Sequence, residues 1–139
     1  MAYRFPSAEW VNEYMRQLNA SPDYERAGKD WERDILFVSE PDRAHPEYAY
    51  FYLDLYHGKC REAKLLSRPD EKKTGYIIST PFNTWRKIIS GELDPIQALM
   101  TRKLKLQGDL MLLMRYPKAA MEMFACVKRV PTDFGDRQA

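Results

Sequence analysis

The sequence contains few of the features that place a protein outside the cytoplasm or inside a membrane. It has only two cysteines, Cys60 and Cys126, which lie in segments of different type, so a stabilising disulfide is not expected. No stretch reaches the roughly 18 apolar residues of a membrane-spanning helix, and the first residues lack the apolar run of a signal peptide. We therefore expect a cytoplasmic protein with two packed thiols.

Patterns that carry catalysis or hold cofactors are also scarce. Only His45 and His57 could act as an imidazole base, and no Gly-rich phosphate loop, paired-cysteine zinc pattern or calcium loop occurs. His57 lies three residues before Cys60, which is a weak pattern for a metal or thiolate pair, and a surface histidine is the simpler interpretation. We expect a protein that is not an enzyme and has no metal and no cofactor.

The charges are almost balanced, because 22 basic residues stand against 20 acidic ones and leave a net charge of +2. Such a balance gives no general attraction to nucleic acid, and aromatic residues are not interleaved with the cations, so no nucleic-acid partner is expected. The cations concentrate toward the C-terminal end, where solvated helix faces explain most of them. The alternative interpretation is a patch that meets anionic headgroups, acyl-thioester phosphates or an acidic partner. These cations are Arg86, Lys87, Arg102, Lys103, Lys105, Arg115, Lys118, Lys128 and Arg129.

The length of 139 residues fits one domain, whose first part, residues 1–34, is expected to be helical. Ser7 is a good N-cap for a first amphipathic helix, and Pro22 is suited to the first turn of a second. The apolar stripe of the first helix has helical spacing. Its members are Val11, Tyr14, Met15 and Leu18.

Residues 35–80 change to the alternating period of β-strands. Strands are predicted at 35–38, 48–57, 60–68 and 75–79, and the last three are expected to form an antiparallel meander. In the longest strand one face is apolar and the other carries four tyrosines and an acid. We expect the N-terminal helix or a second subunit to cover the tyrosine face, and Asp54 to pair with an arginine or a tyrosine hydroxyl. The tyrosines are Tyr48, Tyr50, Tyr52 and Tyr56.

Residues 81–131 return to helices, with one further strand at 103–107, and residues 132–139 form a tail. Thr80 is the expected N-cap of the first of these helices, and Asp109 that of a short apolar one. The order of elements lacks the regular strand–helix alternation of a parallel sheet. The expected fold is therefore α+β, with a single twisted, mainly antiparallel sheet of about five strands and helices packed over one face.

Residues 81–127 resemble the C-terminal half of the sterol carrier protein 2 sterol-binding domain family. The resemblance rests on 85–100, a helix followed by an acidic-Pro turn and a second helix, and on 103–109, a Lys-apolar-Lys-apolar strand followed by Gly-Asp. Arg102 stands where such proteins usually have glycine, and the part before Asp34 does not match closely. The resemblance implies an apolar tunnel that holds a sterol, fatty acid, acyl thioester or phospholipid, and it leaves the ligand identity open.

The expected function is non-catalytic binding and transfer of a lipid or other hydrophobic small molecule. The alternative is an accessory or interaction subunit that supports an enzyme acting on hydrophobic substrates, since many similar proteins are accessory domains. Transient contact with a membrane or an acyl-chain enzyme is included, and a monomer or a homodimer fits both interpretations.

The apolar excess that such a tunnel needs is found in residues 110–114, which are apolar at five successive positions. Packing against one face cannot satisfy a helix of this kind, so another helix or a ligand must cover it. Breakers bound the run, and we expect it to be a gate that a Met111→Glu change would impair. Plain core packing is the competing interpretation for each single residue. The expected cavity wall consists of Phe51, Leu53, Ile78, Phe82, Trp85, Ile89, Leu99, Met100, Leu106, Leu110, Met111, Met114, Met121 and Phe124.

Overall fold

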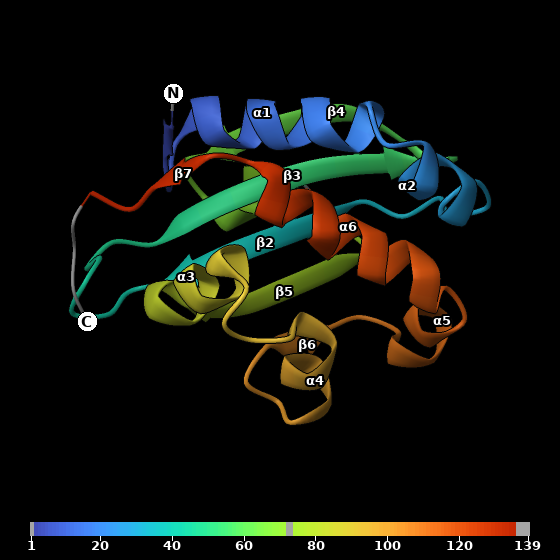
Figure 1. Cartoon of the computed structure of the whole chain (residues 1–139). Helices are drawn as coiled ribbons and strands as arrows, with labels where there is room; N and C mark the ends of the chain where they lie inside the picture. Colours follow the sequence, from blue (N-terminus) through green and yellow to red (C-terminus); the bar gives the residue numbers. More distant parts are fainter. Residues whose placement is uncertain (1, 72–73, 136–139) are drawn as a thin grey trace.

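A computed structural model describes residues 2–71 and 74–135 and places a five-stranded sheet beneath a layer of helices (Figure 1). The α+β class expected from the order of elements is confirmed. The elements in chain order are β1 (Tyr3–Arg4), α1 (Ala8–Asn19), α2 (Pro22–Ala27), β2 (Ile35–Glu40), β3 (Ala49–Tyr56), β4 (Lys59–Leu66), η1 (Pro69–Glu71), β5 (Tyr76–Pro81), α3 (Phe82–Ser90), α4 (Pro95–Met100), β6 (Lys105–Gln107), α5 (Leu110–Met114), α6 (Pro117–Arg129) and β7 (Thr132–Asp133).

The five strands of the main sheet lie in the order β4-β3-β2-β5-β6. All neighbours are antiparallel except β2 and β5, which run parallel. The expected meander is therefore wrong at its third strand, because β5 crosses over to pair with β2 instead of β4. The reason lies in β2, whose first five residues are all buried: a strand that is apolar on both faces needs a neighbour on each side.

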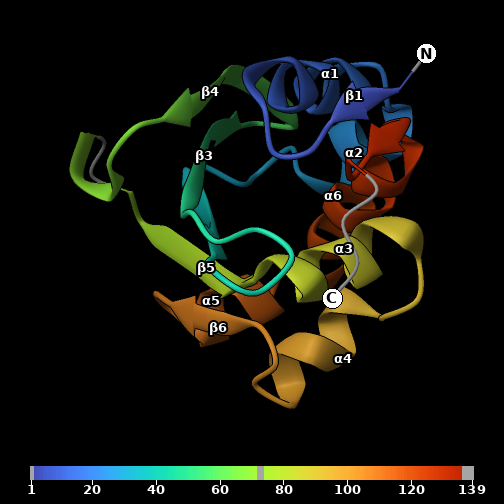
Figure 2. The same cartoon turned by 90° about the vertical axis from the view of Figure 1, so that its left-hand side faces the viewer.

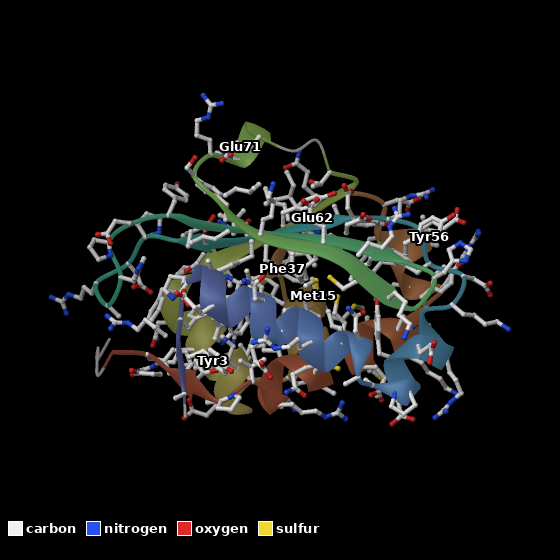
Figure 3. The ribbon with its side chains drawn as sticks, turned by 90° about the horizontal axis from the view of Figure 1, so that it is seen from above. Tyr3, Met15, Phe37, Tyr56, Glu62 and Glu71 are labelled. Carbon is white, nitrogen blue, oxygen red and sulfur yellow. The ribbon has the colours of Figure 1, made fainter. Side chains whose placement is uncertain are left out.

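Helices α1, α2, α3 and α6 cover one face of the sheet, and no α-helix of the described residues lies on the opposite face (Figure 2). Figure 3 places Phe37 and Met15 on the helix side, whereas Glu62 and Glu71 lie on the other side. The tyrosine face of β3 is thus not covered by α1, because Trp10 of α1 contacts Phe51, on the opposite face of β3. On the helix-free face Tyr52 packs in a small separate cluster. The buried members of that cluster are Leu36, Val38, Tyr52 and Leu66.

Side-chain caps define where most helices begin. Ser7 and Ser21 cap α1 and α2, and Asp94 and Asp109 cap α4 and α5, each by accepting a backbone N–H of its own helix. The expected Thr80 cap of α3 is wrong, because the Thr80 hydroxyl donates to the carbonyl of residue 103 instead.

Asp42 supplies the missing cap of α3 from a distant loop. One of its carboxylate oxygens accepts the Asn83 N–H at 2.7 Å, and the other accepts the N–H groups of Ala44 and His45. A single side chain thereby connects the loop after β2 to the start of α3.

The expected partner of Asp54 is an arginine or a tyrosine hydroxyl, and in the structure Asp54 pairs with Arg61 of β4 at 3.1 Å.

Candidate ligand-binding site

The inner face of β2 and β3 forms the floor of an apolar layer beneath the helices. Because side chains alternate along a strand, Ile35 and Phe37 of β2 share this face with Phe51, Leu53 and Leu55 of β3. The register pairs Ile35 with Leu53 and Phe37 with Phe51, so the two strands present matching rows. All five side chains are at least nine-tenths buried.

A first cavity, cavity 1, lies between this floor and helices α1, α3 and α6. It has room for about 20 Å³, roughly the space of one water molecule and far below the roughly 300–1,000 Å³ of small-molecule sites, so a ligand can enter only if the walls move apart. Its wall consists only of apolar and aromatic side chains. They are Phe5, Trp10, Tyr14, Phe37, Phe51, Trp85, Ile89 and Val127.

The polar atoms in the wall of cavity 1 are already bonded to the protein. The Trp10 indole N–H donates to the Thr132 hydroxyl at 2.9 Å, and the Trp85 indole N–H donates to the carbonyl of residue 38 at 2.8 Å. The Tyr14 hydroxyl donates to the Met123 carbonyl at 2.8 Å. A bound molecule would therefore meet ring faces and methyl groups, and a polar headgroup would find no partner in this wall.

Aromatic rings stand close together across cavity 1 and keep it narrow. The rings of Phe5 and Phe51 are stacked at 5.4 Å, and those of Phe37 and Trp85 meet edge to face at 5.5 Å. Phe5 follows β1, which pairs with β7, so the paired chain ends close this side. A ligand must spread these rings in order to enter.

A second cavity, cavity 2, continues the same layer toward helices α2 and α5. It has room for about 10 Å³, so it too is nearly filled by its own side chains. Strands β2 and β3 form the floor of both cavities, whereas α2 and α5 cover cavity 2 in the place that α1 and α3 take over cavity 1. The wall is formed by Tyr24, Trp31, Ile35, Leu55, Leu113, Tyr116, Ala119, Ala120 and Met123.

The partition between the two cavities consists of a leucine below and a hydrogen-bonded pair above. Along β3, Phe51 lines cavity 1 and Leu55 lines cavity 2, so the fully buried Leu53 lies between them. Above it, Tyr14 of cavity 1 holds the backbone of Met123, whose side chain lines cavity 2. In place of the expected elongated cavity, the described residues enclose two small compartments placed end to end.

Burial raises the pKa values of several groups around this partition. Desolvation raises the pKa of the Tyr14 and Tyr24 hydroxyls and of the Cys126 thiol. Desolvation likewise raises the pKa of the Cys60 thiol to about 12. Both cysteines are buried and free, as expected, and their thiols are protonated at neutral pH.

The residues expected from the sequence to form the wall fall into four groups. Phe51, Trp85 and Ile89 line cavity 1. A second group lies in the packed core: Leu53, Ile78, Phe82, Leu99 and Phe124. A third group, Leu106 and Met114, is partly buried against the core. The last group is exposed to solvent: Met100, Leu110, Met111 and Met121.

The apolar run 110–114 lies at the surface rather than inside a tunnel. Leu113 is buried, Leu112 and Met114 pack partly against the core, and Met111 is 75% exposed because it lies on the opposite side of the one-and-a-half-turn helix α5. A carboxylate introduced by Met111→Glu would lie in water and would not test a buried gate. Leu113 is the position on α5 that lines cavity 2.

Half of the wall residues that the sequence did not predict lie in the N-terminal part and in β2. Trp10 and Tyr14 are one helical turn apart on α1, and Phe37 shares its strand face with Ile35. The aromatic side chains of α1 and the alternation of β2 carried this signal. The apolar excess of 110–114, at the other end of the chain, is the stronger pattern and concealed it.

Within residues 2–71 and 74–135, no group of three or more His, Cys, Asp or Glu side chains is arranged to hold a metal ion. In the same part of the chain, every helix is too short or too polar to cross a lipid bilayer.

Comparison with known proteins places the chain in a family. The model of the SCP-2 sterol transfer family matches residues 11–120. The chain belongs to this family. A crystal structure of sterol carrier protein 2 is 32% identical, with a TM-score of 0.82 over 89% of this chain and 97% of that chain.

Two further solved structures are similar. A Thermus thermophilus protein described as possibly a sterol carrier protein is 32% identical, with a TM-score of 0.81 over 91% of this chain and 90% of that one. Sterol carrier protein 2 from Aedes aegypti, solved in complex with palmitate, is 14% identical, with a TM-score of 0.54 over 85% of this chain and 93% of that one. The last likeness shows the fold alone. Among curated proteins, none matches this chain.

Proposed function

We propose that this protein binds the hydrocarbon part of a lipid in the layer formed by cavities 1 and 2 and transfers it without catalysing a reaction. The observation that carries this proposal is the continuous apolar lining of two adjoining cavities under one set of helices, which have room for about 20 and 10 Å³ and would have to widen around a ligand. Membership of a sterol transfer family supports it.

The driving force for binding is the removal of hydrocarbon from water. Each buried methylene contributes about 0.8 kcal/mol, so a long acyl chain gains roughly 10 kcal/mol before an association cost of at least about 4 kcal/mol. The bonded Trp10, Tyr14 and Trp85 polar atoms add no desolvation cost of their own. The difference of at most about 6 kcal/mol corresponds to a Kd of about 40 μM, and the free energy needed to spread the aromatic rings weakens binding further.

A fatty acid is the first ligand to test, and a sterol is the second. Cavity 1 offers no free polar partner, so a headgroup belongs outside it and an unbranched chain could thread past the partition. The palmitate complex of the Aedes aegypti protein supports this choice only through the shared fold.

The nucleophiles of the chain are unsuited to catalysis in these cavities. The Cys60 thiol has a pKa of about 12, so almost no thiolate exists near neutral pH. His57 bonds to Glu32 at the surface, and neither residue is part of either cavity wall. Binding alone is the activity that this set of side chains supports.

Two substitutions on α6 test the site because each fills one cavity. Val127→Trp places an indole in cavity 1, and Ala120→Trp places one in cavity 2. Each should weaken binding of a fluorescent fatty-acid analogue at least about tenfold, measured by titration. Overpacking costs about 1–3 kcal/mol, so circular dichroism and urea unfolding must show that both variants fold.

Lys128→Trp is the matched control, since it adds the same side chain at an exposed position of the same helix. It should bind the analogue like the parent protein. Folded Val127→Trp and Ala120→Trp variants with parental affinity would show that the ligand does not occupy these cavities. A parent protein that binds no fatty-acid, sterol or phospholipid analogue would contradict the proposed function itself.

A further inference from the structure

The end of the molecule formed by α4, β6 and α5 carries a concentration of positive charge; we call residues 95–115 the basic end. In two views related by rotation about the vertical axis, α1 lies at the top and these three elements lie at the bottom (Figures 1 and 2). The basic end contains four cations and one acid, a net charge of +3, whereas the whole chain has a net charge of +2. The remainder is therefore slightly negative.

The basic end also exposes large apolar side chains. Met100, Leu110 and Met111 are 63%, 42% and 75% exposed. Met121 is also exposed, but it lies outside the basic end, in a hollow whose wall includes two acids and two cations: Asp23, Glu122, Arg26 and Lys118. Exposed methionine and leucine beside unopposed cations mark a surface that contacts something both apolar and anionic.

The charges of the basic end are largely unused within the fold. Lys105 pairs with Glu40 at 2.6 Å, and the Asp109 carboxylate accepts the Leu112 N–H at the start of α5. Among the residues that the structure describes, Arg102, Lys103 and Arg115 have no ion-pair partner.

Arg102 has a backbone conformation that favours glycine. Its φ of +64° lies in the left-handed region, which costs a side-chain-bearing residue roughly 1–2 kcal/mol. The side chain is exposed and adds no core packing. An arginine held under strain at the surface is consistent with a use for its charge outside the fold.

Helix α5 joins this surface to cavity 2. Leu113 lines cavity 2, while Met111 and Arg115, one helical turn apart, lie on the opposite side of the helix in solvent. Helix α5 belongs to the basic end, has only five residues, and lies between the apolar layer at cavity 2 and solvent. A ligand that leaves cavity 2 past α5 emerges at this surface.

We propose that the basic end docks on an anionic lipid bilayer, with Leu110 and Met111 among the lipid headgroups and Arg102, Lys103 and Arg115 against lipid phosphates. A bilayer fits better than an acidic protein because it is both negatively charged and the source or destination of an apolar ligand. This inference rests on the proposed lipid-carrier function and adds the surface at which transfer takes place.

Vesicle sedimentation tests this docking with the full chain. The protein should bind vesicles of phosphatidylglycerol and phosphatidylcholine in equal parts, and should not bind vesicles of phosphatidylcholine alone. The triple variant Arg102→Gln, Lys103→Gln, Arg115→Gln should bind roughly a hundredfold more weakly, since each cation near an anionic surface is worth about fivefold. Leu110→Ser with Met111→Ser should weaken binding about tenfold.

The matched control removes the same charge elsewhere, in the triple variant Lys29→Gln, Arg43→Gln, Lys128→Gln, whose side chains all lie outside the basic end and at least partly in solvent. It should bind vesicles within about threefold of the parent, because bilayer attraction acts only within about a Debye length of the surface. Equal losses in the two triple variants would mean that the net charge alone matters, and would overturn the docking site. Retention on immobilised polyglutamate without vesicle binding would overturn it in favour of an acidic protein partner.

Titration with the soluble fatty-acid analogue, without vesicles, separates the two proposals. The basic-end variants should bind the analogue like the parent and deliver it to anionic vesicles more slowly. Unchanged delivery would overturn the docking proposal and leave ligand binding intact. Failure of the parent to bind the analogue would instead contradict the proposed function, whatever the vesicles show.

Discussion

Cavities 1 and 2 have the same floor and similar wall chemistry, but they differ in how they are covered. Over cavity 1 lie α1 and α3, with 12 and 9 residues, together with the paired chain ends. Over cavity 2 lie α2 and α5, with 6 and 5 residues. Helices this short have little stability of their own and depend on their packing. Opening the molecule at cavity 2 should therefore cost less free energy than opening it at cavity 1.

The hydrogen bonds of the tryptophan side chains also differ between the two cavities. In cavity 1 the indole N–H groups of Trp10 and Trp85 bond to β7 and β2, so each ring ties one element of the fold to another. In cavity 2 the Trp31 indole N–H donates to the carbonyl of Arg33, only two residues away. Opening cavity 1 therefore breaks long-range bonds, whereas Trp31 keeps its bond within its own loop.

The largest expected effect comes from removing the floor of the partition. Leu53→Ala should lower the free energy of unfolding by about 3 kcal/mol, because the fully buried side chain leaves a space between the two cavities. The joined compartment should then favour longer acyl chains over shorter ones more strongly than the parent does. Urea unfolding and titration with fatty-acid analogues of different length measure the two effects.

Leu36→Ala is the matched control for that change. Leu36 is equally buried but belongs to the cluster on the helix-free face. It should lower the free energy of unfolding by a similar amount without altering the preference for chain length. If both variants change that preference equally, the partition does not separate the compartments, and the comparison of the two cavities loses its basis.

A smaller effect is expected from the upper part of the partition. Tyr14→Phe removes the donor to the Met123 carbonyl and should lower the free energy of unfolding by about 1 kcal/mol, since a buried hydrogen bond is lost. It should also speed passage of a long-chain analogue between the compartments, seen as faster association in stopped-flow measurements. Tyr52→Phe, on the helix-free face, loses a bond to the Asp34 carboxylate and should leave the association rate unchanged.

The smallest effect on the free energy of unfolding at neutral pH is expected from the buried titratable groups near the partition. Burial raises the Cys60 pKa from its ordinary 9.0 to about 12, so the unfolded chain loses this proton first. The contribution of Cys60 is complete below pH 9 and is lost as the pH rises to about 12. Tyr14, Tyr24 and Cys126 shift in the same direction.

Urea unfolding at a series of pH values across this range checks the titration. The free energy of unfolding should fall with rising pH, and the fall should be smaller in Cys60→Ala. If the free energy of unfolding falls equally with rising pH in parent and variant, the thiol is exposed to water, in conflict with its burial in the structure.

The sequence predicts the elements of the fold better than the order in which they pair. Caps such as Ser7 and Asp109 act within a few residues, and alternation along β3 is a property of the strand itself. The pairing of β2 with β5, and the capping of α3 by Asp42, depend on groups about 40 residues apart in the chain. No local pattern carries that information.

The site was harder to predict than the fold, for a related reason. Apolar composition identifies the residues that avoid water, but it does not tell a packed side chain from one that lines a gap. Phe51 and Leu53 lie two residues apart on one strand face, yet only Phe51 contacts a cavity. A cavity arises where neighbouring elements fail to close on one another, and that depends on how α1 and α6 sit over the sheet.

The two edge strands of the main sheet determine how readily another chain could add to the sheet and start aggregation. β6, at one edge, has only three residues, one of them Lys105, and β4, at the other, alternates charged residues with apolar ones. Short or charged edges are poor templates for strand addition by another chain. If the helical layer separates from the sheet when a lipid enters, these edges would remain poor starting points for aggregation.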